Sequence, residues 1–173
     1  MKLIIKIIAL VTLYMSSVYG EENYLNIDAN HFNADKQNNI LNFEGDVKMT
    51  KNKDILLCQI LVINTQVSKD DPDKQIPKDY KATGDVSFTI NTEDNILKGK
   101  GDIVHYYPLE KKYIIIGNGF LEDVKEGKKI IAEKIYIDEL TGETKIDGGK
   151  DKPIQFRMRL ESVDDSNTTK VKK

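Results

Sequence analysis

The sequence contains no tryptophan, only one cysteine, two histidines and two arginines among its 173 residues. Because Cys58 stands alone, an internal disulfide is excluded, and so is a metal site built on a pair of cysteines. His31 and His105 lie at no spacing that fits a motif, and the chain has no Gly-x-Ser-x-Gly elbow, phosphate loop or His-Glu-x-x-His segment. We therefore expect neither an enzyme nor a metal or other cofactor, and we expect Cys58 to be a small buried hydrophobic residue.

The net charge becomes more negative when the first 20 residues, a predicted signal peptide, are not counted. Lys2 and Lys6 open an apolar run that ends in small residues, a layout typical of a secretory signal peptide, here cleaved after Gly20. A retained membrane anchor is the alternative, because the run is near the minimum length for a membrane span. Removal of residues 1–20 leaves 24 basic against 28 acidic residues, a net charge of −4 with neutral histidines. This balance argues against nucleic acid as a ligand.

After the signal peptide, the apolar residues do not recur at the spacing of a helix but alternate with polar residues, as in a strand. Apolar and polar residues alternate over residues 41–49 and again over residues 86–90. Clusters of Asn, Asp, Lys and Gly separate such runs, as at residues 35–39 and 141–143. The pattern predicts an all-β protein of many short strands, in which one face of the sheet is dry and the other wet.

A fourfold repeat underlies this alternation. Each copy has a small residue, then mostly an acid or amide, then an apolar residue two positions further on, and a glycine follows after a turn. The copies begin at Ala29, Cys58, Gly101 and Ala132, and their glycines are Gly45, Gly84, Gly117 and Gly148, at separations of 16, 26, 16 and 16 residues. We interpret each copy as two strands that must stack on their neighbours, and the glycines as the line along which the sheet bends. The enlarged second copy holds residues 68–79, which we expect to form a surface loop.

Two segments, NFEGDVKM at residues 42–49 and LLCQILV at residues 56–62, resemble the OstA-like family of lipopolysaccharide-transport proteins, also called the LptA family. Further matching segments follow in the family's order, at residues 84–88, 104–106, 117–121 and 131–135. The resemblance covers residues 24–160, nearly all of the chain after the signal. The chain departs from the family at Cys58-Gln59 and Gly101-Asp102, where an Ala-Asp pair is common.

The resemblance implies a twisted β-jelly roll of two antiparallel sheets that form an open, V-shaped groove. This domain would span residues 21–161, and a disordered tail would follow over residues 162–173. The groove would hold acyl chains, whereas the pattern of the residues alone favours a closed sandwich core with nothing bound. The expected lining consists of Leu25, Ile27, Phe43, Val47, Met49, Leu56, Val86, Phe88, Ile90, Val104, Tyr106, Leu121 and Ile135.

The resemblance further implies a place in the periplasm and a role in carrying lipopolysaccharide between the two membranes by head-to-tail assembly. The N-terminal edge, residues 24–29, would meet LptC, and the C-terminal edge, residues 154–160, would meet another copy or the N-terminal domain of LptD. Arg157 and Arg159 would either lie on a solvated strand face or bind phosphates of the saccharide. Two alternatives remain: a membrane-anchored, LptC-like subunit of the same pathway, and a β-scaffold module that binds no lipid.

Overall fold

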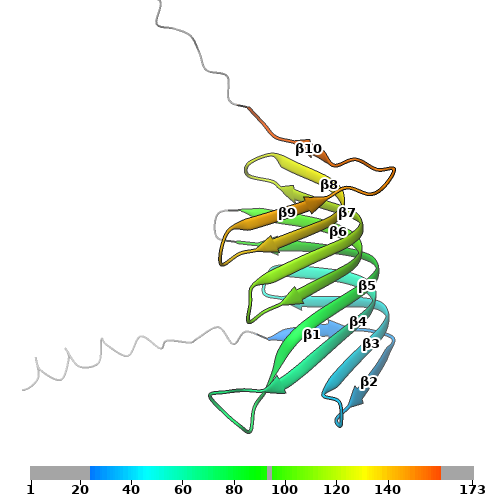
Figure 1. Ribbon diagram of the computed structural model, residues 1–173. Helices are drawn as coiled ribbons and strands as arrows, with labels where there is room; N and C mark the ends of the chain where they lie inside the picture. Colours follow the sequence, from blue (N-terminus) through cyan, green and yellow to red (C-terminus); the bar gives the residue numbers. More distant parts are fainter. Residues whose placement is uncertain (1–23, 93–94, 161–173) are drawn as a thin grey trace, which may run out of the picture.

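A computed structural model of the protein describes residues 24–92 and 95–160 (Figure 1). These residues form strands and no helix, so the all-β prediction is confirmed, and none of them belongs to a helix that could cross a membrane. The predicted signal peptide, residues 1–20, and the predicted tail, residues 162–173, lie outside the described residues. In chain order the strands are β1 (Leu25–Asp28), β2 (His31–Asp35), β3 (Ile40–Lys51), β4 (Asp54–Val67), β5 (Gln75–Asn91), β6 (Ile96–Tyr107), β7 (Lys112–Asp123), β8 (Lys128–Asp138), β9 (Glu143–Asp147) and β10 (Gln155–Arg157).

All of these strands belong to one antiparallel sheet. Its order is β1-β3-β4-β5-β6-β7-β8-β10, with β2 also beside β3 and β9 also beside β8. From β3 to β8, neighbours in the sequence are neighbours in the sheet, and the stack runs in chain order from β1 and β2 at one end to β9 and β10 at the other (Figure 1). The stack ends in two free edges, one at each end.

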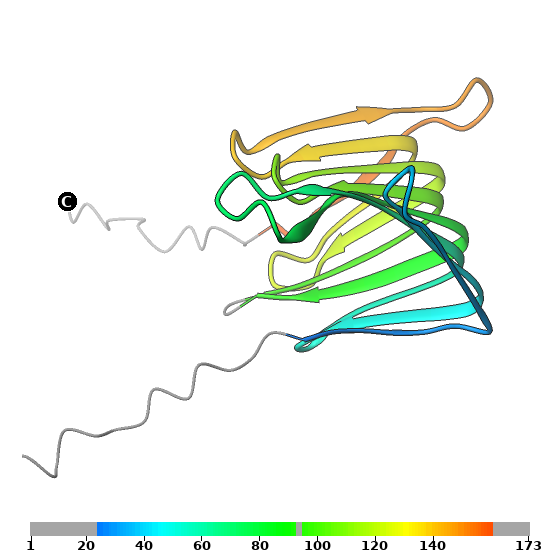
Figure 2. The same ribbon diagram turned by 90° about the horizontal axis from the view of Figure 1, so that it is seen from below.

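The long strands bend sharply part-way along their length, as the view along the stack shows (Figure 2). The bend divides the sheet into a first arm, which contains β1 and β10, and a second arm, which contains β2 and β9. The two sheets implied by the family resemblance are these two arms. They form a single hydrogen-bonded sheet because β3 to β8 run through the bend.

A pair of left-handed residues produces the bend in each of three strands. These pairs are Gly45–Asp46 in β3, Gly84–Asp85 in β5 and Gly117–Asn118 in β7, with φ angles between 46° and 83°. Each pair opposes a shorter stretch of the next strand, which makes a β-bulge, and bulges increase bending and twist. In the first three copies of the repeat, the second residue packs against the glycine of the same copy. The contacts are Asn30 on Gly45, Gln59 on Gly84 and Asp102 on Gly117.

The fourth copy of the repeat behaves differently. Gly148 follows the last residue of β9 and has no left-handed φ angle. Its neighbours are the Lys152 carbonyl and Ile154, and it is Gly149 that lies beside the Glu133 side chain. The bend line predicted from four glycines is therefore made by three, because the fourth strand of this kind stops at the bend.

The expected surface loop at residues 68–79 is shorter than predicted. β4 ends at Val67 and β5 begins at Gln75, so residues 75–79 are part of a strand. Pro77 is tolerated there because this stretch of β5 pairs with β4 alone and because the register shifts between Asn64 and Thr65.

The core lies on the inner side of the bend. Leu61, Ile115 and Ile135 are completely buried, and Cys58 is buried beside them as predicted. Burial of each large aliphatic side chain stabilises the fold by about 1.5–3 kcal/mol.

Candidate functional site: an apolar groove between the two arms

Residues that lie directly opposite each other in neighbouring strands point to the same face of the sheet. On the first arm, one inner-face row runs through Ile27, Met49, Leu56, Phe88, Gly99, Leu121, Ile130 and Phe156. On the second arm, a row runs through Phe32, Phe43, Leu61, Ala82, Val104, Ile115, Ile135 and Ile146. Every residue of both rows is apolar, and each row reaches from one edge strand to the other. The part of the inner face that these two rows cover is therefore apolar along the whole length of the stack.

Gly99 interrupts the first-arm row for a steric reason. A Cβ atom at Gly99 would lie 2.0 Å from Cζ of Phe88, so the Phe88 ring covers the place where a side chain would stand. The glycine thus leaves room for the Phe88 ring to extend over the neighbouring strand.

A cleft of about 220 Å³ lies between the two arms. Its first-arm lining comes from Leu25, Met49, Lys51, Asp54, Ile55, Leu56, Phe88, Thr89 and Ile90, and its second-arm lining from Tyr80, Ala82, Val104, Tyr106, Pro108 and Tyr113. The charged members, Lys51 at the end of β3 and Asp54 at the start of β4, flank the turn at the tip of the first arm. The cleft is thus apolar inside and polar at that tip.

Three tyrosines form a stacked row on the second-arm wall of the cleft. Tyr80, Tyr106 and Tyr113 are directly paired across β5, β6 and β7. Ring centroids lie 5.9 Å apart for Tyr80 and Tyr106, and 4.3 Å apart for Tyr106 and Tyr113. Burial, and then the neighbouring Tyr106, raise the pKa of Tyr80 and of Tyr113. The hydroxyls of Tyr80 and Tyr113 are therefore protonated at physiological pH.

The residues predicted to line a groove fall into two groups. Leu25, Met49, Leu56, Phe88, Ile90, Val104 and Tyr106 line the cleft. Val47, Val86 and Ile135 are buried in the core at the bend, and Ile27, Phe43 and Leu121 are half-buried against that core. Sequence reasoning did not include Lys51, Asp54, Ile55, Tyr80, Ala82, Thr89, Pro108 and Tyr113. The alternation of Tyr80 with Ala82 and of Tyr113 with Ile115 is the signal that could have added the two tyrosines.

The outer face carries His105, one of the two histidines of the sequence. His105 is half-buried and stacks on Tyr107 with ring centroids 6.3 Å apart, on the face opposite Tyr106. Burial lowers the pKa of His105 and the nearby Lys81 lowers it further, whereas Asp79 acts in the opposite sense. Among the described residues, no group of three His, Cys, Asp or Glu side chains could hold a metal ion.

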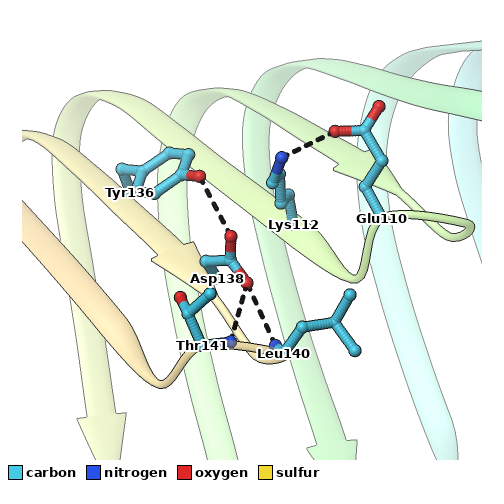
Figure 3. A network of polar contacts seen from close by, with 6 residues as sticks. All are labelled: Glu110, Lys112, Tyr136, Asp138, Leu140 and Thr141. Carbon is cyan, nitrogen blue, oxygen red and sulfur yellow. Dashed lines mark hydrogen bonds and ion pairs between the residues drawn. The ribbon is translucent and has the colours of Figure 1, made fainter.

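A polar network closes the turn between β8 and β9 at the tip of the second arm (Figure 3). One carboxylate oxygen of Asp138 accepts hydrogen bonds from the backbone N–H groups of Leu140, at 3.0 Å, and Thr141, at 3.1 Å. The Tyr136 hydroxyl donates to the other oxygen at 3.4 Å, and a Lys112–Glu110 ion pair of 2.8 Å lies close by. The Thr141 N–H lowers the pKa of Asp138 most, against the opposing effect of burial. The network holds the hairpin that carries the free edge of β9.

The fold and the groove define a class of protein: a single bent β-sheet with an apolar inner face and a free edge at each end. The sequence model of the family described as "LptA/(LptD N-terminal domain) LPS transport protein" matches residues 26–143, so the chain belongs to this family.

Among solved structures, the chain is similar to LptH, the LptA homologous periplasmic component of the conserved lipopolysaccharide transport device from Pseudomonas aeruginosa. The TM-score is 0.65 at 13% sequence identity, over 82% of this chain and 97% of that one. At this identity the likeness supports the fold. No curated protein matches the sequence.

Proposed function

We propose that the protein is a periplasmic carrier of lipopolysaccharide that holds acyl chains between the two arms of its sheet. The observation that carries this proposal is the pair of rows of apolar residues, each of which reaches from one edge strand of the sheet to the other. Each methylene group taken out of water on such a surface contributes about 0.8 kcal/mol. A lipid with several acyl chains would therefore gain enough from the groove to remain bound, and no catalytic step is needed.

The two free edges support assembly by strand addition. Exposed edge strands readily pair with strands of another chain. β1 runs from the tip of the first arm towards the bend, whereas β10 runs from the bend towards the tip. A second copy stacked in the same orientation would therefore pair its β1 with β10 in the antiparallel sense, and its β2 with β9.

This head-to-tail contact does not close on itself, because the two edges lie at opposite ends of the stack (Figure 1). Copies would add one after another into a bridge between the membranes. In this proposal, LptC meets the edge made by β1 and β2, and the N-terminal domain of LptD meets the edge made by β9 and β10. The paired part of the C-terminal edge is the short strand Gln155–Arg157 together with Glu143–Asp147, rather than the whole of residues 154–160.

Photo-crosslinking in cells tests the groove. A light-activated residue is placed at Phe88, on the inner face, and in a matched control at the adjacent Ser87, on the outer face. We expect lipopolysaccharide adducts at position 88 and none at position 87. Folded, exported protein with no adduct at either position would contradict the carrier and support the scaffold that binds no lipid.

The fate of residues 1–20 separates the carrier from an anchored, LptC-like subunit. We expect N-terminal sequencing of the exported protein to begin at Glu21. A protein that retains Met1 and sediments with the inner membrane would support the anchored subunit instead.

A further inference from the structure

The tyrosine row, Tyr80, Tyr106 and Tyr113, is a polar feature on an otherwise apolar wall. The neighbouring row, one step closer to the bend, has Ala82, Val104 and Ile115 on the same three strands. Three adjacent strands thus present aliphatic groups near the bend and phenol groups further out. Tyrosine suits a boundary of this kind because its ring is apolar and its hydroxyl polar.

The geometry of the rings determines which part of each tyrosine is available to a ligand. The planes of Tyr80 and Tyr106 are inclined by 28°, and those of Tyr106 and Tyr113 by 19°. Since neighbouring rings cover one another's faces, the row offers the cleft its ring edges and hydroxyls rather than ring faces. A stacking platform for a sugar ring would need exposed faces, so the row is better suited to hydrogen bonding.

The protonation of Tyr80 and Tyr113 fits the role of hydrogen-bond donors. Burial raises the pKa of Tyr80 and of Tyr113, so that both keep their protons. A protonated phenol can donate a hydrogen bond to an uncharged carbonyl oxygen. A buried carbonyl oxygen without a donor would in turn lose binding free energy.

We propose that the row formed by Tyr80, Tyr106 and Tyr113 binds the boundary between the sugar and the acyl chains of the carried lipid, by hydrogen bonds from its hydroxyls to ester and amide carbonyl oxygens. This inference rests on the proposed function. With its chains against the apolar rows near the bend, an acylated sugar would place these carbonyl groups one row further out, at the level of the tyrosines. The row would thereby set how deeply the lipid enters the groove.

Removal of the hydroxyls alone tests the proposal. Tyr80→Phe, Tyr106→Phe, Tyr113→Phe and the triple variant keep every ring and hence the stack, and circular dichroism verifies the fold. Tyr107→Phe is the matched control, because Tyr107 lies on the outer face beside His105. Two probes are titrated into the purified protein: lipid A, which has ester and amide carbonyls, and diphenylhexatriene, an apolar fluorophore without hydrogen-bonding groups.

We expect lipid A to bind about fivefold more weakly for each hydroxyl that contacts it, the effect of one lost hydrogen bond. Diphenylhexatriene should bind all variants alike, and Tyr107→Phe should bind both probes as the unmodified protein does. If the triple variant binds lipid A with unchanged affinity, or loses both probes equally, the tyrosine inference is wrong while the carrier stands. If the unmodified protein binds diphenylhexatriene but not lipid A, the proposed function itself fails.

Discussion

Gly84→Ala tests whether the left-handed glycines create the bend that forms the groove. Gly84 has a φ angle of +83°, and an added Cβ would lie 2.9 Å from Cβ of Gln59 and 3.0 Å from its Cγ. The left-handed conformation costs an alanine about 1–2 kcal/mol. The overlap with Gln59 adds about 1–3 kcal/mol, since Cβ cannot move without the backbone. The expected loss in the free energy of unfolding is therefore about 2–5 kcal/mol.

Gly142→Ala is the matched control. Gly142 has a similar φ angle, +72°, but a Cβ atom there would have nothing within 4 Å. Its substitution should cost only the conformational part, about 1–2 kcal/mol. The difference between the two variants isolates the close approach of Gln59 to the bend.

Urea denaturation followed by circular dichroism measures both values, because the chain has no tryptophan to report by fluorescence. A double-mutant cycle with Gln59→Gly provides an internal check, since removal of Cβ and Cγ from residue 59 should recover most of the stability lost to the overlap. Equal destabilisation by Gly84→Ala and Gly142→Ala would refute the reasoning and leave the bend to some other cause.

Three further results are expected. Because the pKa of Asp138 is lowered in the fold, its carboxylate stabilises the protein above about pH 4, and this contribution is lost as the pH falls through the lowered value. In thermal melts, Asp138→Asn should therefore lower the Tm more at pH 7 than at pH 3. An equal shift of the Tm at both pH values would contradict this. Burial raises the pKa of Cys58 to about 11, so Ellman's reagent at pH 8 should modify this thiol only in urea, and rapid modification of the native protein would show that the thiol is accessible. If the apolar rows continue from one copy to the next, Ile146 faces Phe32 of the following copy and Asp147 faces its His31. In a Cys58→Ala background, cysteines introduced at positions 31 and 147 should then form disulfide-linked ladders on oxidation. Ladders from cysteines at positions 33 and 147 instead would indicate a shifted register.

Local patterns in the sequence predicted the all-β fold and the repeat, because strand alternation and turn residues are properties of neighbouring positions. The contacts of Asn30 with Gly45 and of Asp102 with Gly117 explain why these two copies of the repeat share a spacing of 16 residues. Gly148 departed from the pattern because its strand ends at the bend, and strand ends depend on pairing partners that spacing does not reveal. The acidic or amide residue after each bend glycine, such as Asp85, was an unused signal, since Asp and Asn tolerate left-handed backbone.

The candidate site was harder to predict than the fold. Alternation places Val86 and Phe88 on one face, but it does not tell which of them lies in the core and which lines the cleft. That difference depends on distance from the bend. The tyrosine row was missed because Tyr80 and Tyr113 become neighbours of Tyr106 only through cross-strand register. Register between strands is set by bulges, and a bulge shifts it by one residue without a clear trace in the alternation.

The apolar rows have a mechanical consequence. Because each row repeats at every strand, a molecule that slides along the groove meets a nearly equivalent surface every 4.8 Å or so, the spacing between strands. The aliphatic part of such a surface opposes sliding with only low barriers, so in the proposed carrier acyl chains pushed in at one end would displace those ahead of them towards the other. The stack of strands would then act as a track, whose direction of traffic is set by what happens at its ends.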